Sequence, residues 1–193
     1  MDAFTREDFR GRVYNDVYRL IDPDFESKRP ATFAAHLLEL LGEVPIRVCD
    51  YGGGSGTLAR HVNSAGRALR AVTWDPFFDT QPRPSGRFEL VVSFEAFEHA
   101  IDPSATLADM LSLTDENHLV LMSTLCQPAE IDALRTDWWY CAPRNGHVSL
   151  HTRQSLDRLA DDAGIGLVHM SDHMHLFHDA LPPWIESAIF GSR

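Results

Sequence analysis

The stretch VCDYGGGSGTLARHV, residues 48–62, places four glycines between a short apolar run and a segment with helical periodicity. The apolar run IRVCD, residues 46–50, is typical of a buried strand, and Leu58 and Val62 repeat at the spacing of a helix that ends near Gly66. Glycines in such a turn let the backbone approach a ligand, and the following helix N-terminus presents free N–H groups. The stretch therefore predicts a ligand-binding loop at the carboxyl end of a buried strand.

Apolar strand-like runs alternate with helical patterns along the rest of the chain, which favours a parallel sheet covered on both faces. A helix from Thr152 to Gly164 precedes two alternating runs that predict an antiparallel hairpin at the end of the sheet. The predicted fold class is therefore α/β, a Rossmann-like twisted sheet of about six strands with helices on both faces. Besides 46–50, strands are predicted at 69–74, 89–93, 118–125, 167–170 and 174–178, and further helices at 30–42 and 102–111.

The composition narrows the classes of partner. The formal net charge of -11 disfavours a nucleic-acid backbone or an anionic membrane surface, since both attract basic proteins, and it favours a small molecule. Cys49, Cys126 and Cys141 show no CxxC spacing, so neither a disulfide framework nor a zinc ribbon is indicated. The first residues lack an apolar leader, and no run of about 18 apolar residues occurs. We expect a cytoplasmic protein whose oligomeric state stays open.

The glycine loop fits two cofactor classes. From Gly54, the spacing G-x-G-x-x-A satisfies a dinucleotide-binding pattern, and Asp75 follows roughly 20 residues on, where a ribose-binding acid is expected. The competing pattern is an acid, Asp50, that ends the strand before alternating glycines. Such an acid can receive a cationic amino group through charged hydrogen bonds, and S-adenosylmethionine carries that group whereas a dinucleotide does not.

Four blocks occur in order along the chain: VCDYGGGSG, VTWDPF, FELVVSFEAFEHAIDP and GHVSLHTRQSLDRLADDAGI. With these blocks the sequence, over roughly residues 30–178, resembles the class I S-adenosylmethionine-dependent methyltransferases, specifically the type 23 small-molecule family. Four ordered blocks are more specific than one glycine loop, and dinucleotide dehydrogenases do not require the third block. The resemblance implies S-adenosylmethionine as the cofactor and methyl transfer as the activity.

The resemblance also implies a cofactor site. The loop glycines line the methionine part of the cofactor with Asp50 in support, and Asp75 bonds the ribose hydroxyls. Pro76 or Phe77 packs on the adenine, a role that suits an apolar ring. The predicted cofactor-binding residues are Asp50, Tyr51, Gly52, Gly53, Gly54, Gly56, Asp75, Pro76, Phe77, Phe94 and Glu95.

The segment after Asp75 departs from the family pattern. Only about a dozen residues separate Asp75 from Phe88, too few for the helix and the extra strand that longer members place there. We therefore expect one edge strand to be missing, together with the acid that commonly touches the adenine amino group. Phe77, Phe78 or Asp79 is expected to substitute for that acid.

Histidines are the candidate bases for methyl transfer, which otherwise needs alignment and dry surroundings. Their ordinary pKa of about 6.5 suits proton uptake near neutral pH. His147, in the irregular stretch 126–151, is the first candidate, and His99, after the third strand, is the second. Tyr140 is expected to form a wall or to bind a proton. For both histidines the alternative is a hydrogen-bonded structural residue that anchors its loop.

Aromatic and basic residues surround the same irregular stretch. Trp138 and Trp139 suit either an acceptor pocket or lid packing. Arg135, Arg144 and Arg153 fit either an anionic acceptor or a solvated surface. The run WWYCAPRNGHVSLHT resembles segments of bacterial methyltransferases found among sugar and cell-surface biosynthesis enzymes, which points to a sugar-derived acceptor.

Histidines also crowd the predicted hairpin. Strand alternation places His173 and His175 on one face and His178 on the other, and His169 lies on the preceding strand. Because only part of this set converges, we predict no metal site. Cys126, directly after the fourth strand, lacks a recognisable catalytic partner and is expected to fill apolar space.

These observations predict one methyltransferase domain over residues 1–193 that methylates oxygen, or with less support nitrogen, on a small-molecule acceptor. Two alternatives come from other classes: an NAD-dependent oxidoreductase that uses the same loop, and a noncatalytic scaffold that retains the fold. The expected parts are an N-terminal cap, 1–29; a cofactor-binding half, 30–125; an acceptor-side insertion, 126–151; and a C-terminal helix, hairpin and tail, 152–193.

Overall fold

Six strands form one sheet in the computed structural model, which describes residues 5–15, 17–77 and 82–191. They are β1 (Arg47–Tyr51), β2 (Arg70–Trp74), β3 (Leu90–Phe94), β4 (Val120–Ser123), β5 (Gly166–His169) and β6 (Met174–His178). The strand order is β2-β1-β3-β4-β6-β5; β1 to β4 pair in parallel, and β6 is antiparallel to both β4 and β5. This arrangement confirms the predicted mostly parallel α/β sheet with an antiparallel C-terminal hairpin.

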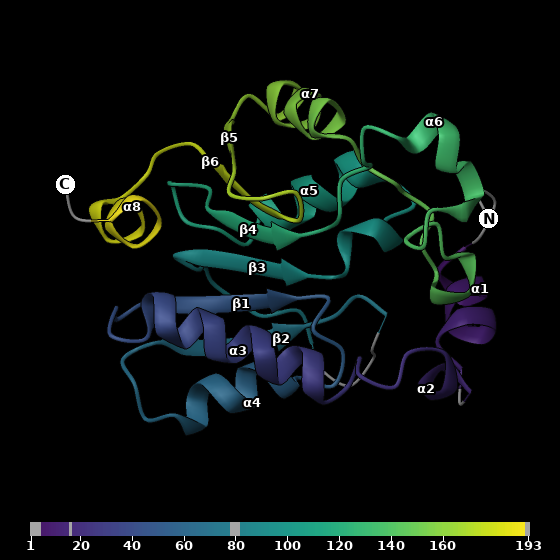
Figure 1. The fold of residues 1–193 in the computed structure, drawn as a ribbon. Helices are drawn as coiled ribbons and strands as arrows, with labels where there is room; N and C mark the ends of the chain where they lie inside the picture. Colours follow the sequence, from purple (N-terminus) through teal and green to yellow (C-terminus); the bar gives the residue numbers. More distant parts are fainter. Residues whose placement is uncertain (1–4, 16, 78–81, 192–193) are drawn as a thin grey trace.

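Helices cover both faces of the sheet (Figure 1). The main helices are α3 (Lys28–Leu41), α4 (Thr57–Ser64), α5 (Pro103–Leu111), α7 (Arg153–Ala163) and α8 (Pro183–Phe190), and the short ones are α1 (Arg6–Asp8), α2 (Tyr18–Ile21) and α6 (Ile131–Leu134). One core cluster joins the sheet to α3, α4 and α8, and a second joins it to α5 and α7. Val48 and Cys49 belong to different clusters, because successive side chains of β1 point to opposite faces.

Local sequence signals set the helix ends. Helix α3 begins at Lys28, two residues before the predicted start, and Pro30 lies in its first turn, where an N–H has no partner within the helix. Helix α7 begins as predicted, with a reciprocal cap: the Ser155 N–H donates to Thr152 Oγ1 at 3.0 Å, and the Thr152 N–H donates to Ser155 Oγ at 2.9 Å.

Strand β2 forms one edge of the sheet, and no other described strand pairs with its outer side. The predicted loss of an edge strand is therefore confirmed. The returning chain packs beside α5, where the Arg83 guanidinium bonds Asp109 and lies 4.8 Å over the Trp74 ring. Phe78 and Asp79, predicted as substitutes for the missing adenine contact, lie outside the described residues.

The N-terminal segment lies beside the carboxyl ends of the parallel strands (Figure 1). Here α1 runs into a π-helical turn, Phe9–Val13, and α2 follows. Phe9, Val13 and Tyr18 form a buried cluster that contacts Phe77, just after β2, and Val148, in the irregular stretch. At the carboxyl edge of the sheet, the segment therefore contacts both the residues that follow β2 and the irregular stretch.

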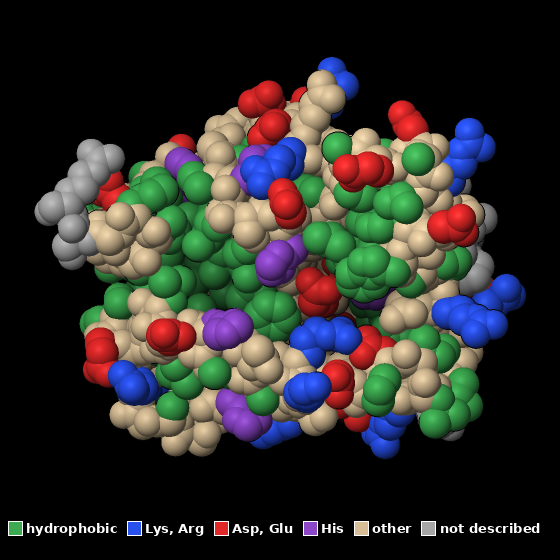
Figure 2. Space-filling model, viewed as in Figure 1, with side chains coloured by type: hydrophobic (Ala, Val, Ile, Leu, Met, Phe, Trp, Pro, Cys, Tyr) green, Lys and Arg blue, Asp and Glu red, His purple; other side chains and the backbone are tan. Residues whose placement is uncertain are grey.

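The described helices include none that is both long and apolar enough to cross a membrane. On the face in Figure 2, hydrophobic side chains are exposed in a hollow between α8 and α3, toward the amino ends of β1 and β3. Acidic and basic side chains are scattered around this hollow. It lies away from the carboxyl ends of the strands, where a doubly wound sheet binds its ligands.

Candidate active site

The glycine loop leaves β1 between the ends of β2 and β3, at the point where the winding of the sheet reverses. Its backbone needs glycine at two kinds of position. Gly52 has φ of +74°, a region that other residues avoid. At Gly53 an added Cβ would lie 1.9 Å from the Asp50 carboxylate, so a side chain here would displace that acid. Gly56 adopts φ of +78° directly before α4 and lets the helix start against Thr73.

Asp50 is a buried carboxylate at the end of β1. Thr73 Oγ1 donates to its Oδ2 at 2.9 Å. The pKa of Asp50 is raised to about 7, chiefly by burial; the Thr73 hydrogen bond opposes this rise, and the nearby Asp75 charge adds to it. No cation is paired with Asp50 among the described residues, so a cationic ligand group at this position would stabilise its charged form.

Asp75 connects the glycine loop to the segment after β2. Its Oδ2 accepts from the Gly54 N–H at 2.8 Å, and its Oδ1 accepts from the Phe77 N–H at 2.7 Å. An ionised carboxylate only accepts hydrogen bonds, and these are what ligand hydroxyls donate. The residue therefore holds its loop in place and still faces the cavity described next.

A cavity of about 620 Å³ opens at the carboxyl ends of β1, β2 and β3, within the range of small-molecule sites. The catalytic candidate His99 lines it. Among the described lining residues are all the predicted cofactor residues except Gly56: Asp50, Tyr51, Gly52, Gly53, Gly54, Asp75, Pro76, Phe77, Phe94 and Glu95. The structure thus brings these residues to one space.

The N-terminal segment supplies part of the cavity wall, a role that the sequence alone left open for Tyr14 and Tyr18. Tyr14, Tyr18 and Phe25 line the cavity, and the Tyr14 ring lies 5.8 Å from the His99 ring. Arg29 also lines it, but its guanidinium makes a two-pronged ion pair with Asp22, at 2.6 and 2.8 Å. The only available signal was a group of aromatic residues ahead of the first predicted helix, and such a group does not reveal what it covers.

Glu98, His99 and His147 form a buried cluster beside the cavity. The Nε2 atoms of both histidines lie 3.9 Å from Glu98 Oε1, and the two imidazole rings are 5.1 Å apart. His147 does not belong to the described cavity wall and lies behind His99. The Val148 and Ser149 N–H groups donate to the Glu98 carbonyl, which ties the irregular stretch to the short 3₁₀ turn at Phe97–His99.

Burial controls the charge of this cluster. The pKa of His99 is lowered to about 3, chiefly by burial and next by the neighbouring His147; burial is also the main reason why the pKa of His147 is lowered. Both imidazoles are therefore neutral near pH 7. Burial, followed by the Glu95 charge, raises the pKa of Glu98 to about 8. The Tyr140 and Thr124 hydroxyls favour charged Glu98, although neither reaches the geometry of a full hydrogen bond to it.

Tyr140 lies behind His147 and outside the described cavity wall. Its hydroxyl accepts from the Leu125 N–H at 3.3 Å, and burial raises its pKa. Trp138 is buried, whereas Trp139 is 74% exposed. The predicted basic residues do not converge here either, because Arg153 pairs with Asp172 at 2.8 Å, and Arg135 and Arg144 are exposed.

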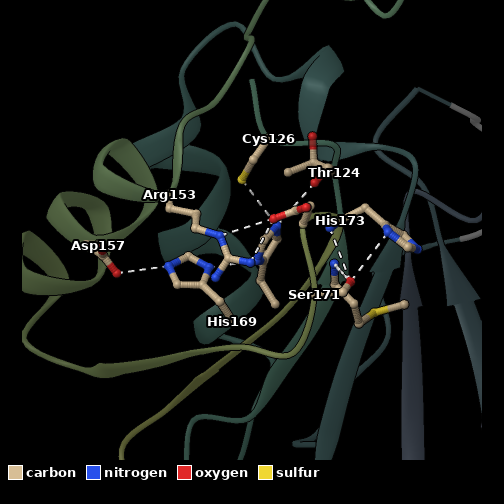
Figure 3. Close-up of polar contacts among 10 residues, drawn as sticks. Thr124, Cys126, Arg153, Asp157, His169, Ser171 and His173 are labelled. Atoms are coloured by element: carbon tan, nitrogen blue, oxygen red, sulfur yellow. Dashed lines mark hydrogen bonds and ion pairs between the residues drawn. The ribbon is translucent and has the colours of Figure 1, made fainter. Parts of the chain in front are cut away.

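The hairpin histidines separate into a bonded pair and outer residues (Figure 3). His175 Nε2 lies 3.2 Å from the Thr124 carbonyl, which can only accept, so this nitrogen donates. His175 Nδ1 then accepts from His169 Nδ1 at 2.8 Å, and His169 Nε2 lies 3.0 Å from Asp157 on α7. Because His175 Nε2 already carries a proton, it cannot deprotonate Cys126, whose pKa burial raises to about 11. Through these bonds the pair of His169 on β5 and His175 on β6 is linked to α7 and to Thr124, directly after β4.

The fold and the cavity define a class of protein. The fold is Rossmann-like and of the methyltransferase type. It has a glycine loop after the first strand, an acid after the second strand and an antiparallel pair of strands at the end of the sheet. A family profile described as a methyltransferase domain matches residues 25–170, which is most of the chain. The chain belongs to this family, the type 23 class I S-adenosylmethionine-dependent methyltransferases, whose cofactor is S-adenosylmethionine.

Solved structures with the same fold are remote in sequence. Magnesium protoporphyrin IX methyltransferase from Synechocystis PCC 6803, with bound S-adenosylhomocysteine, is 14% identical with a TM-score of 0.55, covering 90% of this chain and 96% of that one. The plantazolicin methyltransferase, with bound S-adenosylhomocysteine and a substrate analogue, is 10% identical with a TM-score of 0.54, covering 91% and 94%. A pyocyanin biosynthetic protein is 14% identical with a TM-score of 0.56, covering 76% and 54%. No curated protein sequence matches significantly.

Proposed function

We propose that this protein transfers a methyl group from S-adenosylmethionine to a hydroxyl oxygen of a small molecule. The observation that carries the proposal is the shared cavity, in which the glycine loop with Asp50 and the neutral imidazole of His99 both line one space. The cofactor supplies an electrophilic methyl group on a sulfonium. A neutral nitrogen nucleophile would not require such an imidazole, whereas a hydroxyl must lose a proton.

The residues present fit the cofactor by three physical criteria. Asp50 is a buried acid that a cationic amino group would stabilise. Gly52 and Gly53 have no room for side chains that would hold a ligand away from the backbone. Asp75 lines the cavity with a carboxylate that can accept from ribose hydroxyls, and Phe77 follows it with an apolar ring for the adenine.

The acceptor side favours a neutral molecule over an anion. The cavity wall contains the aromatic rings of Tyr14, Tyr18 and Phe25. Its two described arginines already pair with carboxylates: Arg29 with Asp22, and Arg83 with Asp109. An aromatic or polyhydroxylated acceptor, including a sugar-derived one, therefore fits better than a carboxylate or a phosphate.

The two histidines are assigned different positions in this reaction. His99 lines the cavity and is the group placed to contact the acceptor oxygen. His147 contacts the His99 ring from behind and is therefore a positioning residue, although the sequence pattern ranked it first. Glu98 Oε1 lies 3.9 Å from the Nε2 atoms of both imidazoles.

Calorimetric titration with S-adenosylhomocysteine, with NAD as the paired control, tests the cofactor assignment. We expect micromolar binding of the former and none of the latter. An acceptor screen with labelled S-adenosylmethionine then tests the reaction, and His99→Ala should lower kcat while it leaves S-adenosylhomocysteine affinity intact. Binding of NAD without binding of S-adenosylhomocysteine would support the alternative of an NAD-dependent oxidoreductase. Binding of S-adenosylhomocysteine without any methylated acceptor across the screen would support a noncatalytic scaffold.

A further inference from the structure

Glu98 is an unusual buried acid. Its side chain is 1% exposed, and neither carboxylate oxygen has a hydrogen-bond partner among the described residues. A buried carboxyl group without partners is costly, and in native proteins a catalytic role or a bound ion is among the reasons why such a group is kept. The residue is held rigidly, because its backbone carbonyl accepts from both Val148 and Ser149.

Two imidazoles present nitrogen atoms to this carboxyl group. One ligand atom from each of Glu98, His99 and His147 lies within 4.8 Å of the other two. The Nδ1 of His147 is 2.8 Å from the Tyr140 carbonyl oxygen, which can only accept, so Nδ1 carries the proton and Nε2 offers its lone pair to the cluster. A backbone carbonyl on the far nitrogen is the usual support of a metal-binding histidine.

We propose that Glu98, His99 and His147 bind one divalent transition-metal ion. Two imidazole nitrogens and one carboxylate oxygen suit Zn²⁺, Co²⁺ or Fe²⁺, whereas Mg²⁺ and Ca²⁺ prefer oxygen ligands throughout. In a filled tetrahedral site with bonds of about 2.0–2.2 Å, the ligand atoms lie about 3.4 Å apart. The present separations of 3.9 Å between each Nε2 and Oε1 therefore have to shrink modestly, which small side-chain rotations achieve.

This site deepens the proposed function and rests on it: with an ion bound, His99 would act on the acceptor through the ion and not as a direct base. Among the three ligands only His99 lines the described cavity wall, so the open coordination position of an ion held by the cluster would have to lie on the His99 side to reach the acceptor. Coordination lowers the pKa of the acceptor hydroxyl, whose proton leaves to water. The oxygen then bonds the methyl carbon as the carbon–sulfur bond breaks and a neutral thioether departs. Acceptors with two adjacent oxygens, such as catechols or vicinal diols, would chelate the ion and are the substrate class that we infer.

Direct metal titration of the full chain tests this site without any acceptor. After treatment with a chelator and dialysis, the protein is titrated with Co²⁺ in the visible spectrum and with Zn²⁺ by calorimetry. We expect one ion per chain, with the absorption bands of a four- or five-coordinate cobalt site. His147→Ala removes a direct ligand, and Glu98→Gln replaces an anionic ligand by a neutral amide, so each should weaken binding at least about hundredfold. His173→Ala, an exposed histidine outside the cluster, should bind as the native chain does.

The other possible outcomes would each contradict the metal site, the proposed function or the inferred substrate class. If His147→Ala and Glu98→Gln still bind the metal like the native chain, the ion lies elsewhere. If the native chain binds S-adenosylhomocysteine but no metal, the metal site alone is wrong. S-adenosylhomocysteine titration of each variant without metal verifies folding. If the native chain did not bind S-adenosylhomocysteine, the proposed function itself would be wrong. Methylation of monohydroxyl acceptors at the same rate with and without metal would overturn the inferred substrate class.

Discussion

Asp50 illustrates how burial at one residue bears on the proposed cofactor binding. It lies at the end of the central strand, bonded to Thr73 and near the charge of Asp75. Water cannot solvate its charge, so the pKa rises to about 7 and the free site is partly protonated at neutral pH. A cationic ligand group supplies the missing counter-charge, which makes the protonation state of this acid part of the binding equilibrium.

The affinity for S-adenosylhomocysteine should therefore depend on pH. The ligand's amino cation favours ionised Asp50, so the Kd should fall as pH rises through about 7 and level off above it, with a change of up to about tenfold per pH unit below that value. Calorimetry between pH 5.5 and 8.5 measures this. Asp50→Asn should bind weakly at every pH, with the step removed. A native profile without a step near pH 7 would show that Asp50 does not face the cation.

At the scale of the element, the turn Pro143–Asn145 and the residues after it position His147. Gly146 ends this turn with φ of +89°, and an added Cβ would lie 2.9 Å from Val13 Cγ1 and 3.0 Å from His99 Nδ1. The close contact lets the irregular stretch pack on both the N-terminal segment and the Glu98 backbone. A glycine is thus required here for its conformation and also for its lack of a side chain.

Gly146→Ala should therefore lower both stability and methyl transfer. Gly164 provides a matched control, because it has φ of +71° but nothing within 4 Å of an added Cβ. Each substitution should cost about 1–2 kcal/mol of unfolding free energy from backbone strain, measured by urea denaturation. Only Gly146→Ala should also reduce kcat, with S-adenosylhomocysteine affinity retained. Equal activity in the two variants would mean that the turn does not position the histidines.

At the scale of the whole molecule, one cavity is assembled from segments far apart in the sequence. The N-terminal rings, the glycine loop and His99 all line it. His147, which is distant in the sequence, contacts the His99 ring. Phe9 and Tyr14 lie 6.0 and 5.9 Å from the Phe77 ring, so the N-terminal segment contacts the predicted adenine side as well. Closure of the cavity and exclusion of water therefore depend on this segment.

Removal of residues 1–17 should leave the sheet folded and open the cavity. We expect the Kd for S-adenosylhomocysteine to rise at least about tenfold, equivalent to roughly 1.4 kcal/mol, mainly through faster dissociation, which stopped-flow fluorescence measures. Tyr14→Phe, which keeps the ring and its packing, should bind like the native chain. Unchanged affinity in the shortened protein would show that the segment does not cover the cofactor.

The order of elements could be predicted from the sequence because its signals are local. Apolar runs at β1 and β3, the glycines between Asp50 and Thr57, and Thr152 before α7 each act within a few residues of themselves. The parallel sheet follows from these runs, and with it the position of the glycine loop at the carboxyl edge. The placement of Asp50 and Asp75 at one cavity was predictable for the same reason, since parallel strands end at the same edge.

The sequence by itself thus determined the fold class and the edge of the sheet at which the cavity lies, while the tertiary structure alone decided the composition of the cluster of Glu98, His99 and His147. Glu98 and His147 are far apart in the chain, and their 3.9 Å separation depends on backbone bonds from Val148 and Ser149. Tyr14 reaches the cavity through packing of the N-terminal segment on Phe77. Such contacts follow from how distant surfaces fit together, and local periodicity carries no information about that fit.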